Sequence, residues 1–193
     1  SDTINSLLET KKAYKCFCSH EEIEKLRKTT NSYRYPNIWR ERSDSDIKDE
    51  EQRGTPFSVR LKTPQSGETT FKDHVYGDIS VKNSEIDDFI LARSDENQTP
   101  VYNLVVVVDD HSMAITHIIR GEDHISNTIK QILIYKALNW EIPEFVHLPM
   151  ILGPNKERLS KRHGATGVKE YQKEGYQYEG LLNYLAFLGW NPG

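Results

Sequence analysis

The 193-residue sequence predicts an α/β fold that consists of a small α+β unit followed by half of a doubly wound nucleotide fold. Residues 114–120 alternate like a strand, residues 126–138 have an amphipathic helical pattern, and residues 145–148 form a second short apolar segment. A strand, a helix and a strand joined by connections of this length are typical of a right-handed βαβ unit in a parallel sheet. Before residue 100 the chain instead holds short alternating runs separated by turns.

The first 52 residues predict helices around one short strand. Residues 2–13 place apolar side chains on one helical face, and residues 13–18 alternate like a strand. Ser19 and Glu22 form a capping-box pattern for a helix over 20–30. An irregular aromatic and basic segment (31–42) and a short, charged surface helix (44–52) are expected to follow.

The next segments predict strands. Residues 57–62 alternate cleanly and predict a half-buried strand. A turn at 64–67 and a strand around 70–72 suggest a hairpin, residues 75–81 offer another strand around Gly77, and residues 88–92 are expected to form a short core strand.

From residue 101 onward the expected elements are longer. Val105–Val108 favour a strand on propensity alone. Residues 114–120 predict a buried strand that ends at Gly121, and the helix over 126–138 has Ser126 or Asn127 as its candidate cap. Two further helices are expected at about 167–174 and 178–188.

Composition and charge limit the classes of function. The net charge of −4 argues against a general nucleic-acid coat, so any RNA contact must come from local basic patches such as 25–34 and 156–163. Cys16 and Cys18 lie too close together for an ordinary disulfide framework, and no signal peptide is evident, so we expect a cytoplasmic protein. No apolar window is long enough to span a membrane.

The most distinctive stretch is the basic segment 156–163, which follows a Gly-Pro-Asn turn signal and precedes Gly164. It holds four Lys or Arg side chains and a single small hydroxyl, that of Ser160. Such cations could neutralise charge on a transferring phosphoryl or nucleotidyl group, with Ser160 donating to a phosphate oxygen. Taken alone, the segment is also compatible with a solvated basic loop or a general nucleic-acid patch.

A second stretch narrows these alternatives. Residues 102–110 read YNLVVVVDD and residues 115–124 read ITHIIRGEDH, followed by HLP at 147–149 and LSKRHGA at 159–165. In this order and spacing the motifs resemble the catalytic core of bacterial-type glutamyl-tRNA synthetases, which are class I aminoacyl-tRNA synthetases. The resemblance runs from about Ala13 to Trp190. It implies the second half of a Rossmann core with an inserted α+β connective peptide domain, and a helix over 102–112.

The resemblance implies roles for particular residues. Arg120 would contact the side-chain carboxylate of glutamate, with help from Tyr102. Lys161, Arg158 and Ser160 match the catalytic KMSKS-like motif and would contact ATP together with Leu159. Glu122 and Asp123 could orient the substrate ammonium or the ATP ribose, or could simply be charges at a helix N-terminus. For His117 and His124 a packing or capping role is favoured.

Two departures from the family pattern concern a metal and a loop. Cys16 and Cys18 resemble the start of a structural zinc site, but tryptophan (Trp39) stands where a further cysteine is expected. Two thiolates fall short of a closed four-ligand site, so we expect no zinc. The loop 93–100 lacks the family's glycine and looks two residues longer, which could shift Tyr102.

The resemblance also implies the organisation and the partners. Residues 1–13 would lead out of the first Rossmann half, 14–100 would be the insertion that binds the tRNA acceptor end, 101–155 the second Rossmann half, and 156–193 the KMSKS-like loop with the start of the stem-contact region. We expect a monomeric glutamate–tRNA ligase that uses L-glutamate, ATP with Mg²⁺ and tRNA(Glu), and that binds neither DNA nor membranes.

Both ends of the sequence look cut, and the HIGH-like motif and the anticodon-binding region are absent. We therefore expect these 193 residues alone to lack glutamate-dependent ATP–pyrophosphate exchange. Two alternatives stay open at this point: a short paralogue that glutamylates a modified anticodon base, and a catalytically silent tRNA-binding module.

Overall fold

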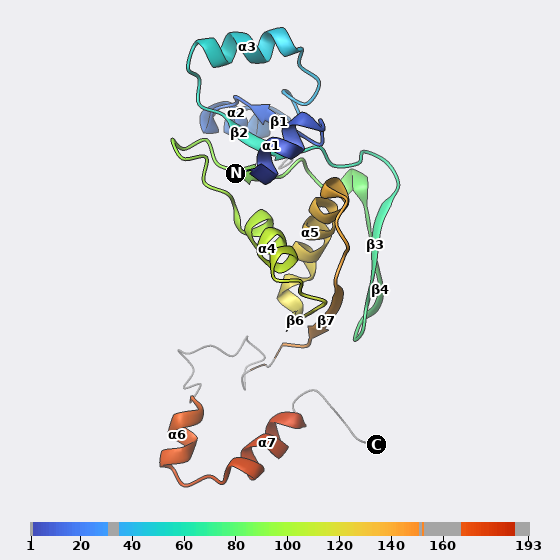
Figure 1. Ribbon diagram of the computed structural model, residues 1–193, viewed down its shortest axis with the longest axis vertical. Coiled ribbons are helices and arrows are strands. Elements are labelled where there is room, and N and C mark those ends of the chain that lie inside the picture. Colours follow the sequence, from blue (N-terminus) through green and yellow to red (C-terminus); the bar gives the residue numbers. More distant parts are fainter. Residues whose placement is uncertain (1, 31–34, 151, 153–166, 188–193) are drawn as a thin grey trace.

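The computed structural model describes residues 2–30, 35–150, 152 and 167–187, and within these the strands form two sheets (Figure 1). The first sheet has the strand order β1-β2-β5, and the second has the order β4-β3-β7-β6. The elements are α1 (Asp2–Glu9), β1 (Ala13–Cys16), α2 (His20–Thr30), α3 (Asp44–Gln52), β2 (Ser58–Leu61), β3 (Glu68–Asp73), β4 (Gly77–Lys82), η1 (Asn83–Glu85), β5 (Ile90–Ala92), α4 (Tyr102–Ser112), β6 (His117–Gly121), η2 (Glu122–His124), α5 (Ile125–Leu138), β7 (Glu144–Leu148), α6 (Val168–Lys173) and α7 (Tyr178–Ala186).

The first sheet is antiparallel, and its central strand is more buried than its sequence predicts. The alternating pattern of 57–62 predicts one polar, solvated face, yet all four residues of β2 are buried. Arg60 on the polar face donates from Nη1 to the Asp88 carbonyl at 2.7 Å, and its guanidinium lies 3.7 Å from the centroid of the Tyr35 ring. The expectation of a half-buried strand is therefore wrong, because a segment distant in the sequence covers its polar side.

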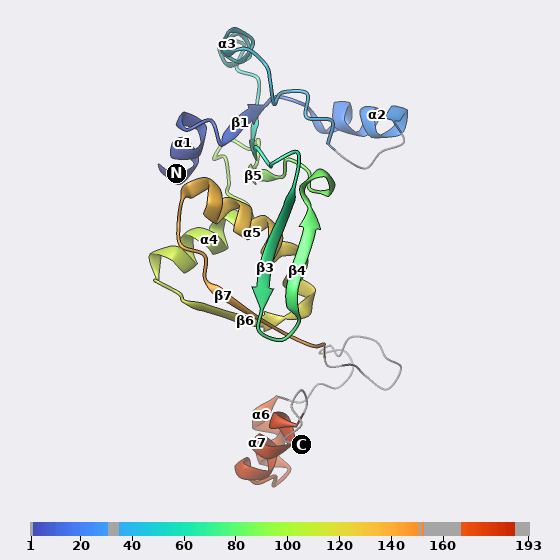
Figure 2. The same cartoon turned by 90° about the vertical axis from the view of Figure 1, so that its right-hand side faces the viewer.

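The second sheet contains the predicted βαβ unit. Strands β6 and β7 pair in parallel from His117–Glu144 to Gly121–Leu148, and α5 connects them. The hairpin suggested by the turn at 64–67 is formed differently: β3 pairs antiparallel with β4, while β2 lies in the other sheet. Strand β3 also joins β7 in parallel through Asp73 and Phe145, so the hairpin extends the βαβ sheet (Figure 2).

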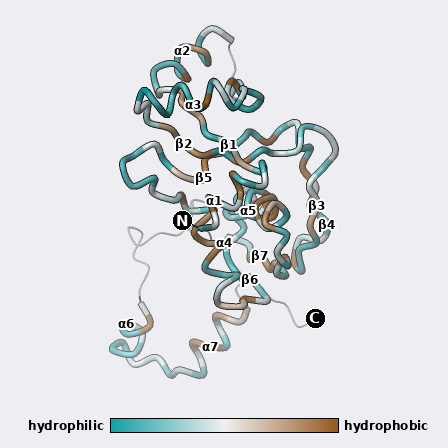
Figure 3. Tube along the Cα trace, turned by 45° about the horizontal axis from the view of Figure 1, so that its top comes forward, coloured by the Kyte–Doolittle hydropathy of each residue, from teal (hydrophilic) through white to brown (hydrophobic). Residues whose placement is uncertain are grey.

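One hydrophobic core crosses the expected domain boundary at residue 100. Its buried members come from α1, the first sheet, α4 and α5: Ile4, Leu7, Ala13, Val59, Leu61, Leu91, Ala92, Leu104, Val107, Leu133, Ile134 and Tyr135. In Figure 3 hydrophobic stretches of the trace gather where these elements meet. The first sheet is thus packed directly on the helices of the second unit, and the division at residue 100 stays a prediction about function.

Two helices show how packing and local geometry set the ends and type of an element. Helix α4 contains Val105–Val108 despite their preference for strands, because Leu104 and Val107 are buried in the shared core. Helix α5 begins at Ile125, directly after η2, with His124 at the N-cap position and no side-chain cap. The expectation of a cap by Ser126 or Asn127 is therefore wrong.

Other expectations hold for the N-terminal helices. The capping box of α2 is confirmed, since the Glu22 amide donates to Ser19 Oγ at 3.1 Å and the Ser19 amide donates to Glu22 Oε2 at 2.8 Å. Helix α3 covers the predicted residues and begins with a similar capping box at Ser43. In the part of the chain that the structure describes, no helix combines the length and apolar character needed to cross a membrane.

Strand β6 does not have the buried character that its sequence suggests. It is an edge strand of the second sheet, and the side chain of Ile119 on the face away from Arg120 is 65% exposed. Arg120 and Ile118 lie on the other face and are partly buried. Within the described residues, only one face of this strand is packed.

Candidate functional site

The candidate site is built around Arg120, near the C-terminal end of β6, where sites of open α/β sheets usually lie. Its guanidinium donates from Nη2 to Thr128 Oγ1 and to Gln131 Oε1, both at 2.7 Å, and from Nε to His147 Nε2 at 3.3 Å. An arginine has five N–H donors, and these three contacts involve those on Nε and Nη2. The Tyr102 hydroxyl is a further hydrogen-bond partner of the guanidinium. Burial lowers the pKa of Arg120, while the neighbouring Tyr102 and Asp110 raise it.

A buried carboxylate–imidazole pair stands behind Arg120. His147 faces Arg120 in the register of β7 and β6, and both His147 and Asp73 are fully or almost fully buried. His147 Nδ1 lies 2.6 Å from Asp73 Oδ2, and His147 Nε2 lies 3.0 Å from Thr128 Oγ1. The sequence reasoning did not find this pair, because Asp73 and His147 are 74 residues apart and Asp73 stands in no recognised motif.

Tyr102 lies close to this arginine. It is the first residue of α4, its side chain is half exposed, and its hydroxyl lies 3.5 Å from His124 Nδ1. The longer loop 93–100 leaves the start of α4 well anchored, because the Arg93 amide donates to the Thr99 carbonyl and the Val101 amide to the Leu91 carbonyl. His124 occupies the N-cap position of α5, but its ring does not cap the helix.

The other histidine of this motif is not a packing residue. The side chain of His117 is 54% exposed, and its Nε2 lies 3.6 Å from Glu144 Oε2. The expectation that His117 packs or caps is therefore wrong.

Glu122 has protein partners of its own. Its carboxylate accepts a short hydrogen bond from the Tyr76 hydroxyl and one from the Met150 amide at 3.0 Å. These two hydrogen bonds lower the pKa of Glu122. Glu122 therefore ties the tip of the β3–β4 hairpin to the segment after β7. Asp123 is its neighbour in η2.

The predicted phosphate-binding segment cannot be compared with this geometry. Arg158, Leu159, Ser160 and Lys161 lie outside the described residues. Their roles stay predictions from the sequence.

The two cysteines share one hydroxyl partner. Cys16 is buried, and its Sγ lies 2.9 Å from the Tyr35 hydroxyl, while Cys18 Sγ lies 3.8 Å from the same oxygen. Hydrogen bonds from Cys18 and Tyr35 hold the pKa of the Cys16 thiol below its ordinary value against the effect of burial. Among the described residues, no three His, Cys, Asp or Glu side chains form a group that could hold a metal. Two thiols and a tyrosine do not fit a closed zinc site, which needs four ligands.

We expect metal analysis of the purified protein to find far less than one equivalent of zinc, because in the described part of the chain no third Cys, His, Asp or Glu joins the two thiols in a group that could hold a metal. The protein should be purified without chelator and measured before and after dialysis against one. Stoichiometric zinc that resists the chelator would contradict this expectation.

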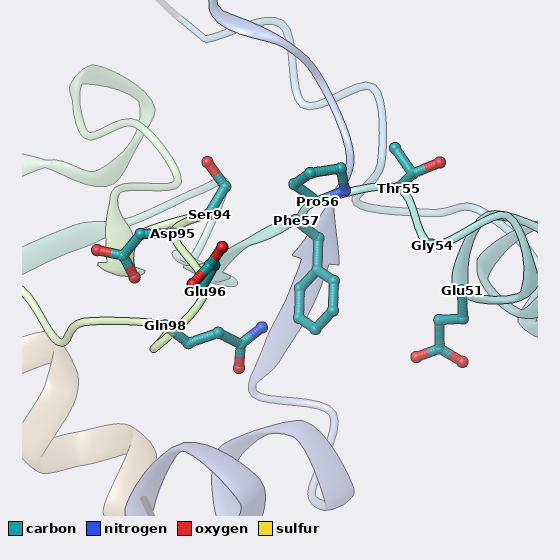
Figure 4. Close-up of a pocket in the computed structure, with 9 residues that line it drawn as sticks. All are labelled: Glu51, Gly54, Thr55, Pro56, Phe57, Ser94, Asp95, Glu96 and Gln98. Carbon is teal, nitrogen blue, oxygen red and sulfur yellow. The ribbon is translucent and has the colours of Figure 1, made fainter.

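An open depression of about 520 Å³ lies between the segment 51–57 and the loop that contains residues 94–98, and Arg120 does not line it (Figure 4). It is lined by Glu51, Gly54, Thr55, Pro56, Phe57, Ser94, Asp95, Glu96 and Gln98. Three of these side chains are acidic, and none is a predicted site residue. The depression does not contribute to the candidate site.

Comparisons with known proteins identify the class of protein to which this fold belongs. The family described as tRNA synthetases class I (E and Q), catalytic domain, matches residues 1–193. The chain belongs to this family.

Two similar relatives and one solved structure are glutamate–tRNA ligases. The chain is 53% identical to the glutamate–tRNA ligase of Coprothermobacter proteolyticus over 95% of its own length, and 48% identical to that of Aquifex aeolicus over 98%. It spans about 40% of the length of these relatives. The crystal structure of a glutamate tRNA ligase from Elizabethkingia meningosepticum, in complex with its amino acid, matches all of this chain and 44% of that one, with a TM-score of 0.82 and 30% identity. The two alternative functions are not favoured by these comparisons.

Proposed function

We propose that the complete enzyme containing this chain is a glutamate–tRNA ligase. A carboxylate oxygen of glutamate attacks the α-phosphorus of ATP, and the bond to pyrophosphate breaks to give glutamyl-adenylate. A hydroxyl at the 3′ end of tRNA(Glu) then attacks the activated carbonyl, and AMP leaves. The support comes from the family membership and from relatives named glutamate–tRNA ligase.

The observation that supports glutamate as the substrate is the burial and hydrogen bonding of Arg120. It is a partly buried cation at the edge of a nucleotide-fold sheet, with Nε and Nη2 already used by protein acceptors. The two N–H groups on Nη1 can donate to a substrate carboxylate, to which they give charge-assisted hydrogen bonds. Tyr102 would complete the contact from the start of α4. A fully bidentate contact through Nη2 would require the substrate to displace Thr128 or Gln131.

The chemistry at phosphate is assigned to the basic segment on sequence grounds. Lys161, Arg158 and Ser160, with Leu159 in the backbone between them, would neutralise and hold the triphosphate. Mg²⁺ bound to ATP would share that charge. Glu122 and Asp123 are candidates for the ammonium or the ribose. Glu122 would do this with the oxygen lone pairs that Tyr76 and Met150 leave free.

The tRNA would contact the N-terminal unit and the segment after β7. The exposed cations Lys25, Arg27 and Lys28 of α2 support a phosphate contact there. We infer a role for 14–100 at the acceptor end, for 101–155 in amino-acid binding, and for 156–193 at ATP and the tRNA stem. A cytoplasmic location is part of the same proposal.

The test of this function is amino-acid-dependent ATP–pyrophosphate exchange with the complete enzyme, followed by transfer of labelled amino acid to tRNA. Glutamate should support exchange and glutamine should not, and the label should reach tRNA(Glu). Exchange that depends on another amino acid, or no exchange with any, would overturn the proposal.

Lys161→Ala should lower the rate of glutamate activation on the order of 10²- to 10³-fold, because it removes one donor that stabilises charge on the transferring group. The KM for glutamate should barely change. The matched control is Lys169→Ala, an exposed lysine in α6 that lies outside the motif. Pre-steady-state formation of adenylate measures the effect, and loss of glutamate binding with activation intact would contradict it.

A further inference from the structure

We propose that Asp73 and His147 are positioning residues that fix the tautomer of the His147 imidazole and thereby hold the Arg120 guanidinium in its substrate-reading orientation. This inference rests on the proposed function of Arg120. It is based on a chain of two contacts that leads from a buried carboxylate to the partly buried arginine. Asp73 Oδ2 lies 2.6 Å from His147 Nδ1, and His147 Nε2 lies 3.3 Å from Arg120 Nε. No part of this network lies in the basic segment or in the KMSKS-like motif.

The donor and acceptor roles decide the tautomer of His147. An ionised Asp73 carboxylate only accepts, so the Nδ1 that faces it must carry the proton. The Nε–H of Arg120 only donates, so the Nε2 that faces it must be the lone-pair nitrogen. A doubly protonated ring would oppose two N–H groups and would add a second positive charge beside the guanidinium. These contacts place the proton on Nδ1, with Nε2 accepting from Arg120 Nε at 3.3 Å and facing the Thr128 hydroxyl, which can donate to it, at 3.0 Å.

Backbone amides fix the orientation of the Asp73 carboxylate. Its Oδ1 accepts from the amides of Val75 and Tyr76, at 2.9 and 3.0 Å, as the chain turns from β3 into β4. Burial would raise the pKa of Asp73, but these amides and His147 together lower it below its ordinary value. The parallel register of Asp73 with Phe145 then brings the carboxylate beside His147, two residues further along β7.

The orientation of Arg120 follows from this pair. His147 accepts from Nε, and Thr128 and Gln131 accept from Nη2, which turns Nη1 away from all three partners. If the proton of His147 moved to Nε2, that N–H would face the Nε–H of Arg120. The guanidinium would then have to rotate or shift away. A substrate carboxylate would lose its donor at the correct place.

The substitution Asp73→Asn should move that proton. Two backbone amides donate to the Oδ1 position and require an oxygen there, which puts the new NH₂ group opposite His147 Nδ1. The His147 amide would lose its acceptor at Oδ2, at 3.2 Å, and would keep only the longer contact to the Oδ1 position, at 3.4 Å. The asparagine NH₂ would donate to Nδ1, and His147 would carry its proton on Nε2.

Nitrogen-15 NMR of histidine-labelled complete enzyme tests the tautomer directly. In the unmodified enzyme His147, assigned by its loss in His147→Gln, should show the neutral ring protonated on Nδ1. Asp73→Asn should shift it to the form protonated on Nε2. If the His147 ring of the unmodified enzyme is protonated on Nε2, or on both nitrogens, the inference is refuted. This outcome does not depend on whether the Asp73→Asn variant folds.

Steady-state kinetics tests the consequence for the substrate. Asp73→Asn should raise the KM for glutamate about tenfold, as expected for one misplaced charge-assisted hydrogen bond, and leave the KM for ATP unchanged. Asp78→Asn, an exposed carboxylate in β4 of the same hairpin, is the control and should change neither. In a His147→Gln background, which has no tautomers, Asp73→Asn should have little further effect.

The outcomes separate this inference from the proposed function. If Asp73→Asn and Asp78→Asn give the same KM for glutamate, or if the effect of Asp73→Asn is equally large with His147→Gln, the positioning role is refuted. Arg120→Gln could instead leave the selectivity for glutamate over glutamine unchanged while His147 carries its proton on Nδ1 as expected. In that case the proposal that Arg120 binds the substrate carboxylate fails, and the inferred geometry of Asp73 and His147 stands.

Discussion

Arg120→Gln in the complete enzyme is expected to lower kcat/KM for glutamate by about 10³-fold and to narrow the gap between glutamate and glutamine. The two amino acids are similar in size, so discrimination must depend on charge. A guanidinium donates to both oxygens of a carboxylate, whereas an amide offers one acceptor and an NH₂ group that meets only donors. The measurement is the ratio of kcat/KM for the two amino acids in pyrophosphate exchange.

Two further variants separate charge from geometry. Tyr102→Phe removes one neutral partner and should cost much less than the loss of the cation. Arg120→Lys keeps the charge but cannot reproduce the contacts to His147, Thr128 and Gln131, so it should lose glutamate activation while it retains part of the discrimination. A selectivity ratio that is the same in Arg120→Gln as in the unmodified enzyme would show that another residue reads the carboxylate.

The fold could be predicted where local pattern and packing agree. The order of strand, helix and strand from β6 to β7 follows from apolar periodicity, and the structure confirms it. The sequence could not show that the polar side of β2 is covered, because Tyr35 and Asp88, which contact Arg60, are distant in the chain. In α4, four consecutive valines favour a strand locally, and burial of Val107 in the shared core outweighs that preference.

Some residues of the candidate site could be predicted from the sequence, and others could not. Arg120 and Tyr102 could be found because they stand in motifs, and the structure brings them close together. The residues that orient Arg120 could not be found as a group, because they come from three elements, β3, α5 and β7, and meet only through the strand register and the packing of α5. These are Asp73, Thr128, Gln131 and His147. The motif that contains Arg120 also gives no sign that Thr128 and Gln131 already accept from Nη2.

A buried carboxylate organises the N-terminal unit, and its sequence context gave no sign of this. Asp88 is fully buried, and its oxygens accept from Arg40 Nη1 at 2.6 and 2.7 Å and from the Tyr14 hydroxyl at 3.1 Å. They also accept from both the amide and the hydroxyl of Thr63, at 2.9 and 2.7 Å. Asp88 therefore joins β1, the end of β2 and the segment that contains Arg40.

Asp88→Ala is expected to destabilise this unit by about 3–5 kcal/mol, the range for breaking a buried ion pair by removing one partner. The Arg40 side chain is only 15% exposed and would keep its charge with Glu41, whose side chain is exposed, as its remaining ion-pair partner among the described residues. The amide of Thr63 would lose its acceptor. Hydrogen exchange of peptides covering 58–63 and 35–42 in the complete enzyme measures the local free energy of opening. The shift of the thermal transition gives a second readout.

Asp87→Ala is the matched control, because this neighbouring carboxylate is only partly buried and, among the residues that the structure describes, accepts from one amide, that of Tyr35, at 3.2 Å. It should cost about 1 kcal/mol. Arg40→Met combined with Asp88→Asn removes both charges and should recover part of the loss, since the penalty of Asp88→Ala arises mainly from the cation left behind. If Asp88→Ala and Asp87→Ala opened the unit equally, the buried pair would not be what holds the 35–42 segment on the first sheet.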